Sequence, residues 1–320
     1  MIYQMGDWIL QTAAAPLSLS FCAFALVLGA IVGSFLGVVV VRLPKILISQ
    51  AHWNDQAEPL GLGHDLDHDE HLKVLPSKAA AVETQAPLTL SYLAYPGSHC
   101  MHCEQALKLT HNIPILSYLA LKGKCGFCEK PIEAWHFWIE LLCGFWWAFC
   151  AFKYGASWAA LAYCVYGSAL ICLAFMDWQT TLLADAITYP LLWGGLISSS
   201  LGISSLPLGL SLWGAVLGYL SLWLISRSYW VLRGKLGLGD GDLKLVAAIG
   251  AWIGAVPLVW LMLFASLSGI VVALILKFKG KLDSQGLIPF GPFLVGSALL
   301  ISVLEVFPQT ASLFNFSSRF

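Results

Sequence analysis

Two acidic residues lie beside long apolar stretches of the sequence. Asp177 directly follows the uncharged run 154–176, and Asp242 closes the glycine-rich segment 237–242 just before the next apolar stretch. Two carboxyl groups that share a site do not both ionise easily, so one keeps a proton while the other loses it. The ionised partner can take a proton from water while the protonated one polarises a peptide carbonyl. The two positions therefore predict an aspartyl pair that hydrolyses a peptide bond.

Simpler structural roles compete with this interpretation. Asp177 suits a helix end or turn at a membrane interface, and Asp242 suits the N-cap of a helix that starts near Leu243. The glycine motif fits twice, so Asp240 is an alternative to Asp242. Charged side chains are costly inside a membrane, and acids that flank apolar spans are for that reason functional candidates.

Four cysteines form a second chemical cluster. They make two CxxC pairs separated by 21 residues, namely Cys100, Cys103, Cys125 and Cys128. Each pair lets two thiolates converge on one ion, and four thiolates complete a closed tetrahedral zinc site. Disulfides or unused thiols are the alternatives, and a reducing cytoplasm disfavours disulfides. We predict a structural zinc, with His99 and His102 as neighbours that do not coordinate it.

These residues must be positioned by membrane helices. The chain of 320 residues is 58% hydrophobic and only 11% charged, with a mean hydropathy of +0.77, which indicates a membrane protein. A net charge of −1, without a basic patch interleaved with aromatics, gives no sign of a nucleic-acid partner. We expect about eight spans, because the run 186–226 is broken by the Ser-rich segment 198–207 and the run 245–276 by Pro257. The expected spans lie in the apolar runs 21–41, 141–152, 154–176, 186–226, 245–276 and 286–304.

The basic residues predict the orientation. With the amino terminus outside, only Lys153 and Arg319 of the 17 Lys and Arg residues fall on the outer side. Both Asp177 and Asp242 then emerge at the cytoplasmic face. The expected fold is an all-α polytopic membrane protein with a first span (1–42), a cytoplasmic zinc-ribbon-like loop domain (43–135) and a transmembrane peptidase domain (136–320). The loop domain contains an acidic insert (49–95), whose His-rich run 64–71 is interpreted as solvated and flexible rather than metal-binding.

Five further blocks of the sequence are distinctive, namely 33–44, 100–128, 177–185, 237–252 and 289–293. Together they resemble the prepilin leader peptidase/N-methyltransferase family, a group of GxGD-type membrane aspartyl proteases. The resemblance implies cleavage of type IV prepilins or type II secretion pseudopilins after a glycine, at the cytoplasmic face of a bacterial inner membrane. It also implies methylation of the new amino terminus with S-adenosylmethionine. On this resemblance Asp177 and Asp242 match the catalytic aspartates, Asp240 falls on a variable position, and Asp185 matches a recurrent acid outside the pair.

Some positions depart from the family pattern. Gly37 stands where asparagine is usual and Met101 where proline is common, and His136-Phe137-Trp138 replaces a basic-aromatic-proline approach. These positions lie in the amino-terminal half, which the family associates with methyl transfer, and the sequence does not place the methyl-donor site. A peptidase without methyltransferase activity is one alternative. An ion-coupled transporter with intramembrane acids is another, although the acids lie at span ends and no broken-helix repeat is visible.

Overall fold

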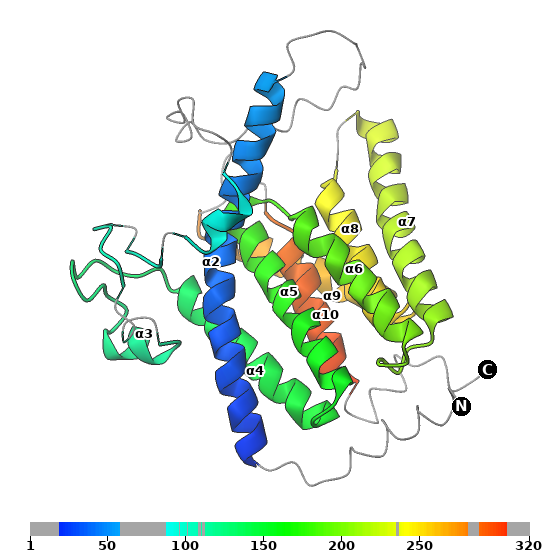
Figure 1. Ribbon diagram of the computed structural model, residues 1–320. Coiled ribbons are helices and arrows are strands. Elements are labelled where there is room, and N and C mark those ends of the chain that lie inside the picture. The colour runs from blue at the N-terminus through cyan, green and yellow to red at the C-terminus, as the bar shows by residue number, and fades with distance from the viewer. Residues whose placement is uncertain are drawn as a thin grey trace.

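The computed structural model describes residues 19–57, 88–95, 97–100, 102–107, 110, 113–234, 237–280 and 288–305. These residues fold into a helical bundle, with a small region of turns and short helices beside its longest helix (Figure 1). The prediction of an all-α protein is confirmed for this part of the chain. The helices are α2 (Leu19–Ala57), η3 (Leu90–Leu93), α3 (Leu116–Ala120), α4 (Trp135–Tyr154), α5 (Trp158–Thr180), α6 (Asp185–Ser200), α7 (Leu208–Arg233), α8 (Asp240–Ile253), α9 (Pro257–Phe278) and α10 (Gly291–Leu304).

Both expected breaks in the long apolar runs are present. The Ser-rich segment separates α6 from α7, and Pro257 begins α9 after α8 has ended at Ile253. Proline is well suited to the first turn of a helix, where its missing N–H has no partner to lose. Gly254 follows α8 with a φ of +82°, a backbone conformation that a residue with a side chain rarely adopts.

Four of the described helices are long and apolar enough to cross a membrane, namely α2 over Leu19–Ala51, α5, α7 and α9. Eight crossings are therefore not confirmed. Helices α8 and α10 contain 14 residues each. At 1.5 Å per residue each is about 21 Å long, shorter than the hydrocarbon core of about 30 Å.

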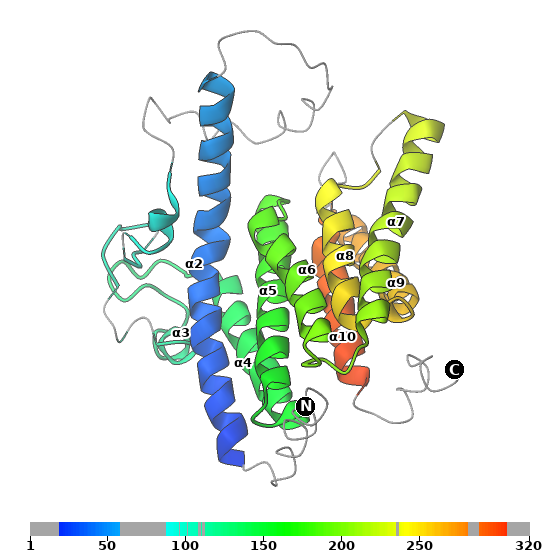
Figure 2. The ribbon, with the colours of Figure 1, turned by 45° about the vertical axis from the view of Figure 1, so that its right-hand side comes forward.

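Helix α8 forms the centre of the carboxyl-terminal part of the bundle. It packs against α6, α7, α9 and α10 (Figures 1 and 2). From Leu243 onward every residue of α8 except Lys244 is buried. The backbones of α7 and α8 meet at Gly214 and Gly250, where a Cβ on either residue would overlap the carbonyl of the other. Small residues at such crossings let membrane helices pack closely.

Helix α2 is longer than the predicted span 21–41 because it continues through Arg42 and Pro44. The Arg42 side chain is only 7% exposed. Its guanidinium donates hydrogen bonds to the carbonyl oxygens of Tyr92 (2.9 Å), Leu93 (3.3 Å) and Gly97 (3.3 Å). A buried cation is tolerated only when its donors are satisfied in this way. Arg42 therefore holds Tyr92, Leu93 and Gly97 against α2.

Candidate functional site

Asp177 lies in the last turn of α5, which ends at Thr180. Its side chain is only 5% exposed, and Oδ2 accepts a hydrogen bond of 2.9 Å from the backbone N–H of Gly291. A solvated turn residue would be exposed and would have no such distant partner. Asp177 therefore lies at a helix end, as the simpler interpretation expected, but it is buried and has a partner far along the chain.

Gly291 contacts Asp177, and the sequence did not single it out for such a contact. It begins α10 and lies 114 positions from Asp177 along the chain. A Cβ at this position would lie 2.6 Å from Asp177 Oδ2 and 3.1 Å from its Cγ. Only glycine lets the helix end approach the carboxylate this closely. The free N–H groups at a helix N-terminus, with their partial positive charge, favour an anionic partner. In the sequence, the Gly-Pro pair at 291–292, before the last apolar run, could have pointed to this contact.

Asp242 lies in the first turn of α8, and the N-cap of this helix is Gly239. The interpretation of Asp242 as an N-cap is wrong, because the helix begins at Asp240 and not near Leu243. Asp242 is half-buried, whereas Asp240 is exposed. Burial thus distinguishes Asp242 from Asp240, the neighbouring acid that also fits the glycine motif.

Asp177 and Asp242 interact electrostatically although 64 residues separate them in the sequence. The negative charge of Asp177 acts on the Asp242 carboxyl, which also accepts a hydrogen bond from the backbone of Gly239. Asp242 precedes the apolar part of α8, so its carboxyl lies at the end of that helix. The structure thus brings both predicted aspartates to one end of the bundle, close enough for the charge of one to hold a proton on the other.

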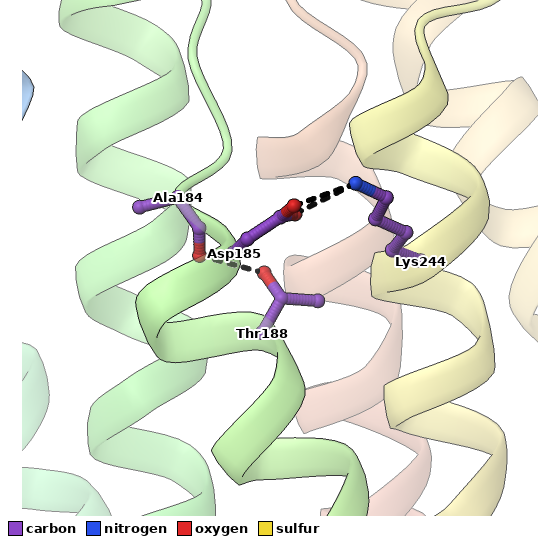
Figure 3. Close-up of polar contacts among 4 residues, drawn as sticks. All are labelled: Ala184, Asp185, Thr188 and Lys244. Carbon is purple, nitrogen blue, oxygen red and sulfur yellow. Dashed lines mark hydrogen bonds and ion pairs between the residues drawn. The ribbon is translucent and has the colours of Figure 1, made fainter. Parts of the chain in front are cut away.

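An ion pair crosses between helices at the same end of the bundle. Figure 3 shows Lys244 of α8 pointing toward Asp185, the first residue of α6. Lys244 Nζ lies 2.9 Å from Asp185 Oδ1 and 2.7 Å from Oδ2. Because Lys244 is two residues after Asp242, this pair fixes the first turn of α8 against α6. Asp185 is thus engaged by a cation in the described structure, unlike Asp177 and Asp242.

The four cysteines converge as their spacing predicted. Their Sγ atoms all lie within 4.8 Å of one another, and His99 and His102 are outside this group. The two CxxC turns have the same backbone pattern. Cys100 N–H donates to Gln105 O at 3.0 Å, and Cys125 N–H donates to Lys130 O at 2.9 Å. The residue after each second cysteine has a positive φ, 57° for Glu104 and 56° for Glu129.

Two matching turns that present four thiolates to one point fit a tetrahedral metal ion. Zinc bound by four thiolates has Zn–S distances of about 2.3 Å, and a tetrahedron of that size places its sulfurs about 3.8 Å apart. The distance between Cys100 Sγ and Cys128 Sγ is 3.9 Å. The four thiols thus converge at a spacing close to that of a four-sulfur zinc site. The His-rich run 64–71 lies outside the described residues.

Both halves of the chain match models of known protein families. Residues 27–154 match the Bacterial Peptidase A24 N-terminal domain, and residues 164–274 match the Type IV leader peptidase family. The second match contains both Asp177 and Asp242. Fold, site and matches together define a membrane peptidase of the type IV leader peptidase class. No solved structure matches the chain.

Full-length relatives identify the family. The chain is 40% identical to a prepilin leader peptidase/N-methyltransferase of Burkholderia pseudomallei strain 1026b, over 90% of this chain and 87% of the relative. It is 38% identical to the protein of the same name from Neisseria gonorrhoeae, over 92% of this chain and 91% of the relative. The corresponding values for Pseudomonas aeruginosa are 35%, 88% and 89%. The chain belongs to the prepilin leader peptidase/N-methyltransferase family.

Proposed function

We propose that this protein cleaves the leader peptides of type IV prepilins or type II secretion pseudopilins, and that Asp177 and Asp242 are its catalytic pair. The observation that carries the proposal is the meeting of these two carboxyls, from α5 and α8, at one end of the bundle. Prepilin is named in the relatives, and the pseudopilins are added because the family resemblance implies them. The same names support methylation of the new amino terminus as a second activity.

The pair would activate a water molecule. At the start of the reaction one proton is shared between the two carboxyls, and its titration belongs to the pair. The ionised carboxyl accepts a proton from water as the water oxygen attacks the scissile carbonyl carbon. The protonated carboxyl donates to the carbonyl oxygen. The tetrahedral intermediate then collapses, the C–N bond breaks, and a proton passes to the departing amine.

The distribution of charge supports a cytoplasmic site in a bacterial inner membrane. Lys244 lies beside the aspartates, whereas Lys153 lies at the end of α4 and pairs with Glu305 beyond α10, at 3.8 Å. Lys153 is one of the two basic residues that the topology assigns to the outer side. We propose eight crossings, by α2 and α4 to α10. The helices α8 and α10 are shorter than the hydrocarbon core. They can still be part of the crossings, because neighbouring helices surround much of their surface.

We also propose that the four cysteines bind a structural zinc ion. Four sulfur ligands leave no position for water or substrate, so the ion would stabilise the turns around it rather than take part in cleavage. A small region with few buried apolar residues gains its stability from such a centre.

Co-expression with a prepilin tests the catalytic pair. We expect Asp177→Asn and Asp242→Asn each to abolish the leader-sized mass loss, since each removes a carboxyl that water activation requires. Asp240→Asn is the matched control, because Asp240 is an exposed acid on the same helix turn as Asp242. Normal processing by both Asp177→Asn and Asp242→Asn would refute the proposal.

A further inference from the structure

Helices α4 and α5 form an antiparallel pair, joined by the short connection 155–157 (Figure 1). Two contacts fix how they lie against each other. Trp147 Nε1 donates a hydrogen bond to Ser168 Oγ at 2.8 Å, and the rings of Tyr154 and Tyr163 stack with their centroids 4.7 Å apart. A step toward the end of α4 is therefore matched by a step of similar length back toward the start of α5.

Two cysteine thiols meet between these contacts. Cys150 lies between the two α4 residues and Cys164 between the two α5 residues, and their side chains form a hydrogen bond with each other. Both are buried, with Cys150 0% and Cys164 6% exposed. Both thiols are free, so the structure shows the reduced pair. Thiols that touch across a fixed interface need little backbone movement to form a disulfide.

The cysteine pair lies near the outer end of the bundle in the proposed orientation. Cys150 is four residues before the end of α4 at Tyr154, about 6 Å along the helix. Cys164 is six residues after the start of α5 at Trp158, about 9 Å along that helix. Lys153, which the topology assigns to the outer side, is three residues from Cys150. The outer compartment of a bacterial inner membrane is oxidising, and disulfides persist there.

The same interface contains a second cysteine pair that serves as an internal control. Cys143 of α4 and Cys172 of α5 are both buried and lie close enough to interact. Cys143 precedes Cys150 by seven residues, so this second pair lies about 10 Å deeper in the bundle. A protein oxidant in the outer compartment reaches the end of the helix pair before it reaches this depth. The two pairs therefore differ in their distance from the outer side.

We propose that Cys150 and Cys164 form a disulfide in the native protein, and that this bond joins the two halves of the chain at the outer side of the membrane. Cys150 lies in the part that matches the A24 N-terminal domain, and Cys164 is the first residue of the leader peptidase match. The bond would restrain α5, the helix that carries Asp177, against α4. The inference rests on the proposed orientation of the bundle and not on the proposed cleavage.

The oxidation is a thiol–disulfide exchange with a protein disulfide of the outer compartment. The thiolate of Cys164, the less buried of the two, attacks one sulfur of that disulfide, and the other sulfur leaves as a thiolate. The thiolate of Cys150 then attacks the Cys164 sulfur of the mixed disulfide and displaces the remaining thiolate. The protons from the two cysteines end on the two thiolates of the oxidant, which is reduced to a dithiol. Because both cysteines are buried in the complete bundle, the exchange precedes the closure of the neighbouring helices around them.

The experiment maps the oxidation state of the cysteines in the full-length protein. Cells that express it are quenched in acid, and the protein is denatured in excess N-ethylmaleimide, digested without reductant and analysed by mass spectrometry. We expect most chains to yield a linked peptide pair with Cys150 and Cys164, whereas Cys143 and Cys172 carry the alkyl group. The inference fails if Cys150 and Cys164 are alkylated in most chains, or if either is linked to Cys22. A link between Cys143 and Cys172 at equal yield would also overturn it, because oxidation would then not depend on distance from the outer side.

Cys150→Ser and Cys143→Ser are matched variants, because each removes one buried thiol from the same face of α4. Thermal unfolding in lipid nanodiscs, with and without a phosphine reductant, measures what the bond contributes. We expect the reductant to lower the unfolding temperature of the unsubstituted protein and of Cys143→Ser by several degrees more than that of Cys150→Ser. An equal effect on all three would overturn the claim that the bond restrains α4 and α5. If Cys150→Ser does not fold, the mapping of the unsubstituted protein still decides the inference.

A separate measurement tests the orientation. Ala156 is exposed in the connection between α4 and α5. In a chain that also carries Cys150→Ser and Cys164→Ser, Ala156→Cys should react in spheroplasts with a membrane-impermeant maleimide. Labelling of Ala156→Cys, together with a reduced pair in the unsubstituted protein, would show that the inference is wrong although the orientation is right. Without labelling the orientation is wrong and the inference falls with it, whereas the expected loss of cleavage in Asp177→Asn is unaffected.

Discussion

The hydrogen bond from Gly291 to Asp177 leads us to predict that one added methyl group, in Gly291→Ala, slows leader cleavage. In Gly291→Ala the new Cβ would lie 2.6 Å from Asp177 Oδ2, 3.1 Å from Cγ and 3.3 Å from Cβ. The contact with the Asp177 Cβ means that rotation of the carboxylate alone does not relieve the overlap. The helix end or the aspartate must move, and the 2.9 Å hydrogen bond must lengthen or break.

The size of the effect follows from the value of that bond. Hydrogen bonds to charged groups contribute about 1.5–3 kcal/mol. A loss of 1.36 kcal/mol of transition-state stabilisation slows a reaction about ten-fold. We therefore expect Gly291→Ala to lower kcat/KM for leader cleavage by about 10- to 150-fold. The assay is the time course of leader removal from a detergent-solubilised prepilin, followed by mass spectrometry.

Gly296→Ala provides the control in the same helix. A Cβ at Gly296 would meet nothing within 4 Å, so this variant carries the same chemical change without the overlap. Alanine is favoured over glycine within helices by about 1 kcal/mol, so a change in helix propensity would not slow either variant. Cleavage by Gly291→Ala within two-fold of Gly296→Ala would refute the role of this contact.

Two further predictions concern other groups. The Lys244–Asp185 ion pair is partly exposed, so it should stabilise the fold only weakly. A double-mutant cycle with Lys244→Met and Asp185→Asn should therefore give a coupling free energy of unfolding below about 1 kcal/mol. Each variant should still cleave prepilin. Cys125→Ser should lower the zinc content from about one ion per chain, measured by elemental analysis.

Local sequence patterns predicted the features that depend on few residues. The CxxC spacing predicted the convergence of four thiolates because each turn brings its own pair together. Pro257 and the Ser-rich segment likewise predicted helix ends, because each acts on the backbone where it stands. The aspartates were singled out because acids beside apolar runs are rare and costly, and their catalytic role stays a prediction.

Contacts between distant segments were not predictable in this way. The sequence gives no sign that the backbone of Gly291 meets Asp177, since a glycine before a proline is common in many turns. Arg42 appeared to mark the end of a span, yet α2 continues past it because helical hydrogen bonds do not require apolar side chains. The partners of Arg42 are backbone carbonyls about 50 residues away, and backbone groups have no sequence signature.

The position of the aspartates at the end of the bundle has a physical reason. A buried carboxylate requires hydrogen-bond donors, and within a helix the backbone N–H groups are already used. Free N–H groups occur at helix N-termini, and α10 directs one of them at Asp177, while Asp242 lies in the first turn of α8. A carboxylate pair halfway along these helices would have no such donors. A substrate would therefore have to bring its scissile bond to the edge of the membrane, and its apolar helix would remain within the bilayer.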